Sequence, residues 1–432
     1  MSEPGVARAS LFVLLGKLGA SLGLFAGALV LARALGPADR GGIAFITSTA
    51  LIFGVVSAAG LREASMVFLA RYPERRPQLI GNQLGFGTLF SLVAAIVVST
   101  VLALVPQLRP SDVTLLDVLI LGAGIVGVAL ETSGYAMTLG LSLFRRMAVF
   151  QTLHTWVYAI VLAAVWWLSE LTLTRAAVIW VAGQALGGVL MIAGVLRRSA
   201  VARPSLRLFR EEWRFGSRAW VGSLSTFLGF RLDQTIMGVI STPSQLGIYA
   251  VAVNASEVEL YVPQSVANGL VPTVVRTSPE QRAERALGVF RFVTIATVVT
   301  AAVALASGPY LVPAVFGQAF RPSVGPFLWL VAGGLGFVAN SIFSATLVAS
   351  DAPGKASLGP LAALVVGTVF DFALIPSHGA TGAAIAAAAG FVAGGLTAAA
   401  AFARVYPVSP RLLVPRRTDL DQVAAVLRRL RA

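Results

Sequence analysis

Apolar blocks of about 20 residues or more recur along nearly the whole chain, and this pattern constrains the fold more than any other feature. Of the 432 residues, 57% are hydrophobic and 12% are charged, whereas roughly a quarter of a typical soluble domain is charged. A block of this length crosses the hydrocarbon core of a bilayer as a helix. The blocks lack the strict alternation of apolar and polar residues that a membrane β-barrel requires. We therefore predict an all-α polytopic membrane protein.

The blocks predict about twelve membrane spans. The first apolar run, from Leu11 to Leu31, is too long for the apolar region of a signal peptide, which is about 7–15 residues, so we count it as a span. The predicted spans cover residues 10–34, 42–61, 82–105, 115–141, 147–168, 175–196, 216–240, 246–272, 287–307, 324–349, 356–376 and 380–403.

The 33 Lys and Arg residues give the chain a net charge of +14. If the N-terminus is cytoplasmic, most of these residues fall in cytoplasmic segments and few fall in the outer loops. Such an asymmetry is the usual determinant of orientation, so we predict that both termini are cytoplasmic. The positive charge then faces anionic lipid headgroups, and we expect no nucleic-acid partner.

Two six-span lobes are predicted, because the long basic connection 197–215 falls halfway along the chain. Two segment pairs also repeat at nearly the same separation: 37–43 resembles 243–248, and 174–188 aligns with 381–395. Parallel repeats of this kind are a common plan in transporters. We predict an N-terminal lobe over residues 1–205, a C-terminal lobe over 206–432 and a basic amphipathic tail over 411–432. The segment beginning at Leu206 is also amphipathic, which indicates an interfacial helix.

Charged residues concentrate in the stretch 230–272, where the hydrocarbon core disfavours them. A charge at this depth costs several kcal/mol unless it faces protein or water. On a helix, Gln234 shares the face of Arg231, whereas Asp233 points nearly the opposite way. In the next span, Asn254, Glu257 and Tyr261 form one polar stripe. We predict that Arg231, Gln234, Asn254 and Tyr261 contact a substrate, and that Asp233 and Glu257 form ion pairs or bind a coupling ion. The alternative for Arg231 is a structural ion pair with a carboxylate such as Glu257.

Five further polar residues are candidates, most of them with a structural alternative. Lys17 either faces a cavity or extends its side chain to the inner interface. Arg62 follows Gly60 at a possible helix break, and either guards the inner mouth of a cavity or forms an interfacial pair with Glu63. Glu131 and Asp371 are carboxylates within predicted spans, and Asp371 is near enough to the outer water for a structural role. His154 either lines the cavity or packs in the helix bundle.

Several sequence motifs together resemble those of polysaccharide flippases (Wzx-like proteins) of the multidrug/oligosaccharidyl-lipid/polysaccharide superfamily. The resemblance covers both halves of the chain, and no single motif is catalytic. The motifs are L-A-R-A-L-G-P-A-D-R-G-G at 31–42, A-G-L-R-E-A-S-M-V-F-L-A-R-Y at 59–72, R-L-D-Q-T-I-M-G followed by L-G-I-Y-A-V-A within 231–252, and L-I-P-S-H-G-A-T-G-A-A-I-A at 374–386.

The resemblance implies a V-shaped pair of six-helix lobes around a central cavity, in the inner membrane of a bacterium. Such proteins move undecaprenyl-diphosphate-linked glycans from the cytoplasmic to the outer leaflet. The partners implied are the lipid-linked glycan, anionic membrane lipids, a polysaccharide polymerase and glycosyltransferases. Arg binds phosphate through two parallel hydrogen bonds, so we expect Arg231 to contact the diphosphate together with Lys17.

Two other functional classes compete with a flippase. A drug antiporter shares the predicted lobes, but its cavity for organic cations would be dominated by acidic residues. A membrane enzyme that polymerises glycans would need a long outer loop with catalytic residues, and the outer loops here are short. The chain has no Cys and two His, so we expect no metal site. It has no P-loop for ATP, so we expect no cofactor other than a coupling proton or sodium ion.

Overall fold

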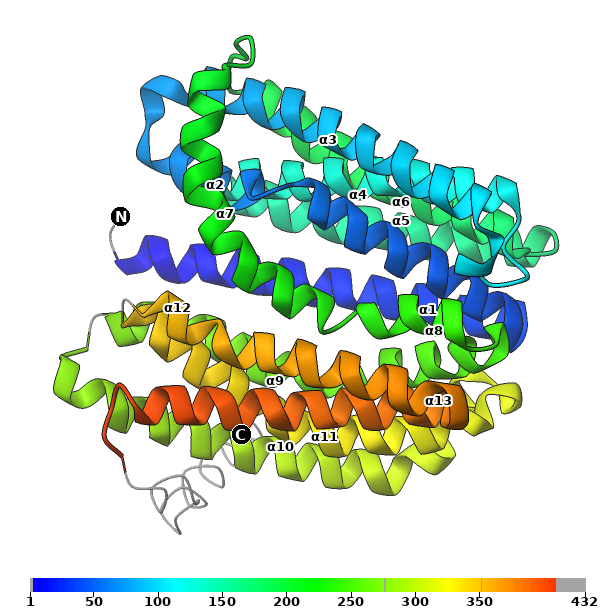
Figure 1. Ribbon diagram of the computed structural model, residues 1–432. Helices are drawn as coiled ribbons and strands as arrows, with labels where there is room; N and C mark the ends of the chain where they lie inside the picture. Colours follow the sequence, from blue (N-terminus) through cyan, green and yellow to red (C-terminus); the bar gives the residue numbers. More distant parts are fainter. Residues whose placement is uncertain (1–2, 276, 351, 409–432) are drawn as a thin grey trace. The chain divides into compact units, whose positions relative to one another are not determined.

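The computed structural model describes residues 3–275, 277–350 and 352–408, and this part of the chain is helical without any strand (Figure 1). The basic tail predicted over residues 411–432 lies outside the described residues.

The helices are long and follow one another through short connections. Short 3-10 helices lie at Pro73–Arg75, Pro106–Leu108 and Gln318–Ser323. The α-helices are α1 (Glu3–Ser57), α2 (Leu61–Arg71), α3 (Arg76–Leu104), α4 (Leu115–Gly140), α5 (Phe144–Leu168), α6 (Leu173–Leu196), α7 (Leu206–Leu228), α8 (Leu232–Ile240), α9 (Pro243–Val275), α10 (Pro279–Phe316), α11 (Val324–Ala349), α12 (Pro353–Ala356) and α13 (Leu358–Ala403).

The predicted spans correspond to these helices. Within the described residues, eight helices are long and apolar enough to cross a membrane. Two of them, α1 and α13, each contain a glycine with non-helical backbone angles, Gly36 and Gly379, and so each holds two predicted spans. The predicted spans 216–240 and 246–272 correspond to α7 with α8 and to α9. The prediction of an all-α membrane protein is confirmed.

The described residues group into two compact units by their contacts with one another. Unit 1 contains residues up to Phe227 together with Thr242–Gly247, and unit 2 contains Leu228–Ser241 and the chain from Ile248 onward. Most of α7 therefore belongs to unit 1, although the sequence analysis assigned residues from 206 onward to the second lobe.

Small residues permit close helix packing in unit 1, where apolar attraction between helices is weak because lipid is equally apolar. Gly60 adopts a positive φ of 85° where the chain passes from α1 to α2. A Cβ atom at Gly60 would lie 2.6 Å from the backbone of Gly216 in α7. A Cβ atom at Gly188 of α6 would lie 2.8 Å from the backbone of α4. Both contacts require glycine. The contact between Gly60 and Gly216 places α7 against the break between α1 and α2.

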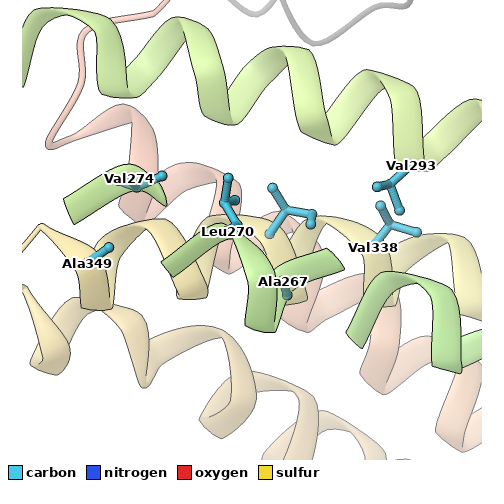
Figure 2. Close-up of a cluster of buried hydrophobic side chains, with 7 residues drawn as sticks. Ala267, Leu270, Val274, Val293, Val338 and Ala349 are labelled. Atoms are coloured by element: carbon cyan, nitrogen blue, oxygen red, sulfur yellow. The ribbon is translucent and has the colours of Figure 1, made fainter. Parts of the chain in front are cut away.

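Unit 2 has a buried apolar cluster between α9, α10 and α11. Figure 2 shows Leu270 and Val274 of α9, Val293 of α10 and Val338 of α11 at this cluster. Elsewhere in the unit, α11 and α13 cross at Gly336 and Gly395, where a Cβ atom on Gly395 would lie 2.3 Å from the Gly336 carbonyl oxygen. Unit 2 therefore combines an apolar core with a close glycine crossing.

The first half of α7 is attached to unit 1 by a buried polar contact. Asn82 of α3 donates a hydrogen bond from Nδ2 to Oε2 of Glu212 (2.5 Å), and its Oδ1 accepts one from the amide of Ser205 (2.6 Å). Glu212 is completely buried, one turn after the buried Leu208. Leu206 and Trp213 are about half exposed. The amphipathic helix thus packs one face on unit 1 and leaves an apolar surface for a membrane interface.

The pKa of Glu212 is raised to about 7. Burial is the main cause, the hydrogen bond from Asn82 opposes it, and the nearby Glu211 adds a smaller upward contribution. Because the folded pKa lies above the ordinary value of 4.5, burial of the ionised carboxylate costs stability at pH 8. That cost is relieved as the pH falls from about 7 toward the ordinary value.

We therefore expect the Glu212→Gln variant to lose this pH dependence. Relative to the variant, the wild-type protein should gain stability on the order of 3 kcal/mol between pH 8 and pH 5. Thermal melting of the purified protein at several pH values measures this difference. The exposed neighbour provides a control, since Glu211→Gln should follow the wild-type pH profile within about 1 kcal/mol. Parallel pH profiles for Glu212→Gln and wild type would contradict the assignment.

Candidate functional site

Unit 1 contains a polar cluster formed by Lys17 of α1, Arg62 of α2 and Glu131 and Tyr135 of α4. The predicted helix break is present, because α1 ends at Ser57 and Gly60 precedes the start of α2. Arg62 lies in the first turn after this break. Its guanidinium interacts electrostatically with Lys17, Glu131 and Tyr135. The structure thus brings together two predicted substrate-binding residues and one predicted coupling carboxylate, and adds a tyrosine that the sequence analysis did not select.

The positive charge of Arg62 is only partly balanced. Its Nη1 atom lies 4.0 Å from Oε1 of Glu63, at the limit of an ion pair, and that Glu63 oxygen also accepts a hydrogen bond from Ser223 (2.8 Å). The Nε atom of Arg62 is buried without a hydrogen-bond partner in the described part of the chain. The side chain is 29% exposed. Arg62 therefore retains donors for a further acceptor.

Lys17 and Arg62 are like charges close enough to repel each other. Lys17 is exposed on the surface of unit 1. Two neighbouring cations of this kind are stabilised when an anion lies between them, and phosphate oxygens suit both guanidinium and ammonium donors. The pair therefore has the charge and the donors to hold an anion, and we call it the candidate anion-binding element of unit 1.

His154 of α5 packs inside unit 1. It is 4% exposed, and its Nδ1 atom lies 3.0 Å from the carbonyl oxygen of Phe150. A Cβ atom at Gly187 of α6 would lie 2.9 Å from the imidazole ring. The position agrees with the structural alternative for His154. Glu131 is within electrostatic range of the ring.

In unit 2, Arg231 forms an ion pair with Glu257 of α9, with Nη1 at 2.8 Å from Oε1. Arg231 precedes α8 and has non-helical backbone angles, so the helix is interrupted where this charge lies. Both side chains are about a quarter exposed. Tyr261, one turn further along α9, is within electrostatic range of the guanidinium. A carboxylate partner thus engages Arg231, and no phosphate is needed to balance it.

A second group in unit 2 joins Asp233 of α8, Tyr249 of α9 and Asp371 of α13. The Tyr249 hydroxyl donates a short hydrogen bond to Oδ2 of Asp233, and the Gln234 amide donates one to Oδ1 (2.6 Å). Asp371 is 4% exposed, with its Oδ1 unpartnered among the described residues, and it interacts electrostatically with Asp233. The sequence analysis placed Asp371 near water, but helix packing buries it.

A small cavity of about 20 Å³ adjoins this group. It is lined by Asp233, Tyr249, Ser256 and Glu257, with Phe230 and Phe391 among its apolar walls. A volume of this size admits about one water molecule, or a desolvated monovalent cation.

The other predicted residues differ in accessibility. Gln234 is 6% exposed and its side chain is buried, whereas Asn254 is half-buried on α9. Tyr249 was missed by the sequence analysis, although it lies in the motif L-G-I-Y-A-V-A. Its partner Asp233 is 16 residues earlier on another helix, so helical spacing gave no signal for the contact.

A family model described as "Polysaccharide biosynthesis protein" matches residues 6–278 of the chain. The match confirms the predicted family resemblance. None of the curated protein sequences matches the chain.

Several solved membrane-transporter structures have a similar fold. An inward-facing multidrug resistance MATE family transporter of the MOP superfamily has a TM-score of 0.75 at 13% identity, covering 90% of this chain and 96% of that chain. The lipid II flippase MurJ, in an inward closed conformation, has a TM-score of 0.74 at 11% identity, covering 96% and 92%. A MOP superfamily transporter from Pyrococcus furiosus, for which a reverse polarity of the binding pocket is described, has a TM-score of 0.61 at 14% identity, covering 94% and 95%. The TM-scores show that the fold is shared, although the sequence identities are low.

The ion pair between Arg231 and Glu257 predicts a specific pattern of stabilities. Arg231→Ala leaves Glu257 without its partner, so the variant should be destabilised on the order of 2 kcal/mol. Adding Glu257→Ala to it should restore at least half of the loss, as measured by thermal melting. The exposed pair Arg75–Glu211, whose Nη1 and Oε2 atoms are 3.3 Å apart, is the matched control. Its single variants should each lose less than about 1 kcal/mol.

A double variant as unstable as Arg231→Ala alone would contradict a structural pairing. In that case Arg231 would again be a candidate for direct contact with substrate.

Proposed function

Because the chain belongs to the polysaccharide biosynthesis protein family, we propose that it flips an undecaprenyl-diphosphate-linked glycan across the membrane by alternating access. The direction is from the cytoplasmic to the outer leaflet, as in the assembly of a cell-surface polysaccharide. The chain is a multi-pass membrane protein with the fold of the MOP transporters. The transporter and flippase character of its family and its structural neighbours supports a transport role.

The observation that carries this proposal is the proximity of Lys17 and Arg62. A lipid diphosphate carries its negative charge at the membrane interface, where the transporter has to replace part of its hydration. Two cations that repel each other in the empty protein gain favourable contacts when the diphosphate lies between them. The unpartnered Nε of Arg62 supplies a further donor. Tyr135 supplies a hydroxyl beside Arg62 that suits the glycan or the phosphate.

Arg231 was predicted to bind the diphosphate as well. Its ion pair with Glu257 at 2.8 Å neutralises the guanidinium, so we assign the phosphate contact to Lys17 and Arg62 instead. Asn254 and Tyr261 on α9 are half-buried and remain candidates for hydrogen bonds to the sugars.

A drug antiporter is the second candidate, and the similarity to a multidrug resistance transporter favours it. An organic cation would bind best among unpaired carboxylates. The described cluster of unit 1 instead contains the neighbouring cations Lys17 and Arg62, with Glu131 within electrostatic range of Arg62, which favours an anionic substrate.

The transport prediction concerns the two cations of unit 1. Lys17→Ala and Arg62→Gln should each lower the flipping rate at least about tenfold, since each removes a charge-assisted contact to phosphate. Arg62→Lys should recover only part of the rate, because an ammonium lacks the planar fork of the guanidinium. The measurement is flipping of a fluorescent polyprenyl-diphosphate-linked sugar in proteoliposomes with equal protein content. Arg203→Gln, an exposed arginine outside the cluster, serves as the control.

Unchanged rates in both cluster variants would contradict the phosphate assignment. Transport of an organic cation, with no flipping of the labelled lipid by wild-type protein, would favour the antiporter.

We assign coupling to the group formed by Asp233, Tyr249 and Asp371, which would take a proton or a sodium ion. The buried, unpartnered oxygen of Asp371 and the adjoining small cavity support this assignment. Asp371→Asn should make the flipping rate insensitive to an imposed proton or sodium gradient, while the rate without a gradient changes less than about threefold. The assay compares gradients of each ion separately. If the variant still responds to the gradient that accelerates wild type, coupling lies elsewhere.

The proposed location is the inner membrane of a bacterium, with both termini cytoplasmic. Glycosyltransferases would then supply the glycan on the cytoplasmic side, and a polymerase would consume it on the outer side. The chain has no Cys, so single cysteines can report orientation. Cysteines replacing Glu170 or His378 should react with an impermeant reagent in intact cells, whereas those replacing Arg75 or Arg203 should not. All four positions are exposed, and the reverse labelling pattern would exclude this orientation.

A further inference from the structure

A basic cavity lies in unit 1, apart from the cluster of Lys17 and Arg62. It is formed at the turn between α4 and α5 and at the end of α6, and has a volume of about 470 Å³. Arg145 and Arg146 line it from the first turn of α5, and Arg198 lines it from just beyond α6. The proposed function uses none of these residues.

The three arginines of the cavity have no carboxylate partner among the described residues, where the observed ion pairs involve other side chains. Arg146 is held in place by a hydrogen bond from Nη1 to the carbonyl oxygen of Gly194 in α6 (2.9 Å). Arg145 and Arg198 are exposed. Three cations around one cavity repel one another, so the cavity gains stability when an anion enters it.

The local backbone favours an anion as well. Ser142 adopts a positive φ of 57° in the turn, and α5 then begins at Phe144 with no side chain capping its N-terminus. The amide groups of a first helical turn carry partial positive charge and can donate to an anion. This contribution adds to the three guanidinium groups, which provide the main attraction.

An apolar stripe continues from the cavity along α5 and distinguishes a lipid from free phosphate. Val149, which lines the cavity, is 52% exposed. Leu153, Trp156 and Ile160 follow at helical spacing and are 45%, 40% and 61% exposed. In a helix that crosses a membrane, such a stripe faces acyl chains. A phosphate group in the cavity and acyl chains along the stripe would satisfy both surfaces at once.

The packing of α5 on α6 creates the room for this arrangement. A Cβ atom at Gly194 would lie 3.1 Å from the ring of Phe150 and 3.9 Å from Nη1 of Arg146. Glycine therefore lets both side chains lie against α6, where Phe150 forms an apolar wall of the cavity. On the opposite side of α5, His154 and Tyr158 are buried. The exposed stripe is thus on the side of α5 away from His154 and Tyr158. At its edge, Trp156 donates a hydrogen bond from Nε1 to the carbonyl oxygen of Gly19 in α1 (3.1 Å).

We propose that this cavity binds the phosphate headgroup of an anionic phospholipid, whose acyl chains lie along the stripe of Val149, Leu153, Trp156 and Ile160. By the orientation proposed above, this lipid belongs to the cytoplasmic leaflet. Basic cavities between membrane helices on that side are suited to anionic lipids. The site is independent of the transported substrate, and the binding test does not require flipping activity.

Native mass spectrometry of the full chain tests the proposal. The delipidated protein is titrated in detergent with phosphatidylglycerol, with phosphatidylcholine and, at matched ionic strength, with inorganic phosphate. We expect phosphatidylglycerol to bind at least about tenfold more tightly than phosphatidylcholine. An excess of inorganic phosphate should not displace it, because free phosphate gains nothing from the apolar stripe.

Two variants with equal loss of charge separate the cavity from the general basic surface. Replacing Arg145, Arg146 and Arg198 by Gln should weaken phosphatidylglycerol binding by about fivefold for each arginine removed. Replacing the exposed Arg203, Arg207 and Arg210 by Gln should change it less than about twofold. The single variant Arg198→Gln, at an exposed helix end, should show the fivefold loss without affecting folding. If the triple variant melts at a lower temperature than the wild type, the phosphatidylglycerol affinity of Arg198→Gln becomes the deciding measurement.

Equal losses in the two triple variants would overturn the proposal in favour of a diffuse basic surface. Phosphatidylcholine binding as tightly as phosphatidylglycerol would also overturn it, as would displacement by inorganic phosphate. Flipping that fails while this lipid still binds would contradict the proposed function and leave the lipid site intact.

Discussion

A charge in a hydrocarbon environment is stabilised by a partner inside the protein, and this constraint explains the contacts of Arg231 and Asp233. Arg231 lies 2.8 Å from Glu257, and Asp233 accepts hydrogen bonds from Tyr249 and from the Gln234 amide. Each contact joins α8 to α9 or closes the start of α8. The interruption of the helix before α8 follows from the same constraint, because freed backbone groups near polar side chains can be satisfied. These polar contacts thus fix the local fold of unit 2 around Arg231 and Asp233.

Close helix packing at glycines is the second stabilising interaction, and it is clearest in unit 1. The helices of unit 1 approach closely at glycines, as at Gly60 with Gly216, where a side chain on either residue would meet backbone. Close approach increases dispersion contacts, which drive helix association where lipid is as apolar as the helix surface. The same approach places Arg62, two residues after Gly60, at the break between α1 and α2. The position of Arg62 in the candidate anion-binding element therefore depends on the contact between Gly60 and Gly216.

Much of the helical fold could be predicted from the sequence, since span length and hydrophobicity depend on local composition. The break at Gly60 and the pairing of Arg231 with Glu257 were also among the sequence-based alternatives. The contacts that escaped prediction join residues far apart in the chain. Asn82 and Glu212 are 130 residues apart, and periodicity within one helix cannot reveal such a pair. Asp371 looked close to water because its position along the helix was visible in the sequence, whereas the neighbours that bury it were not. The predicted lobe boundary at 205/206 rested on the position of the basic connection 197–215 and on the repeats, whereas the grouping by contacts places residues up to Phe227 in unit 1.

The two units differ in how their charges are balanced, and this difference supports separate roles. In unit 2 the cation Arg231 is neutralised within the protein. The carboxylate of Asp233 lines a cavity of about 20 Å³ and interacts electrostatically with the buried Asp371. A space of that size excludes a diphosphate but suits a proton carrier or a small cation. In unit 1 the cations Lys17 and Arg62 repel each other and Nε of Arg62 is buried without a partner among the described residues, which suits the proposed anionic ligand. A transporter that couples an anionic lipid to a cation gradient needs both kinds of site, and separating them between units avoids direct neutralisation of one by the other.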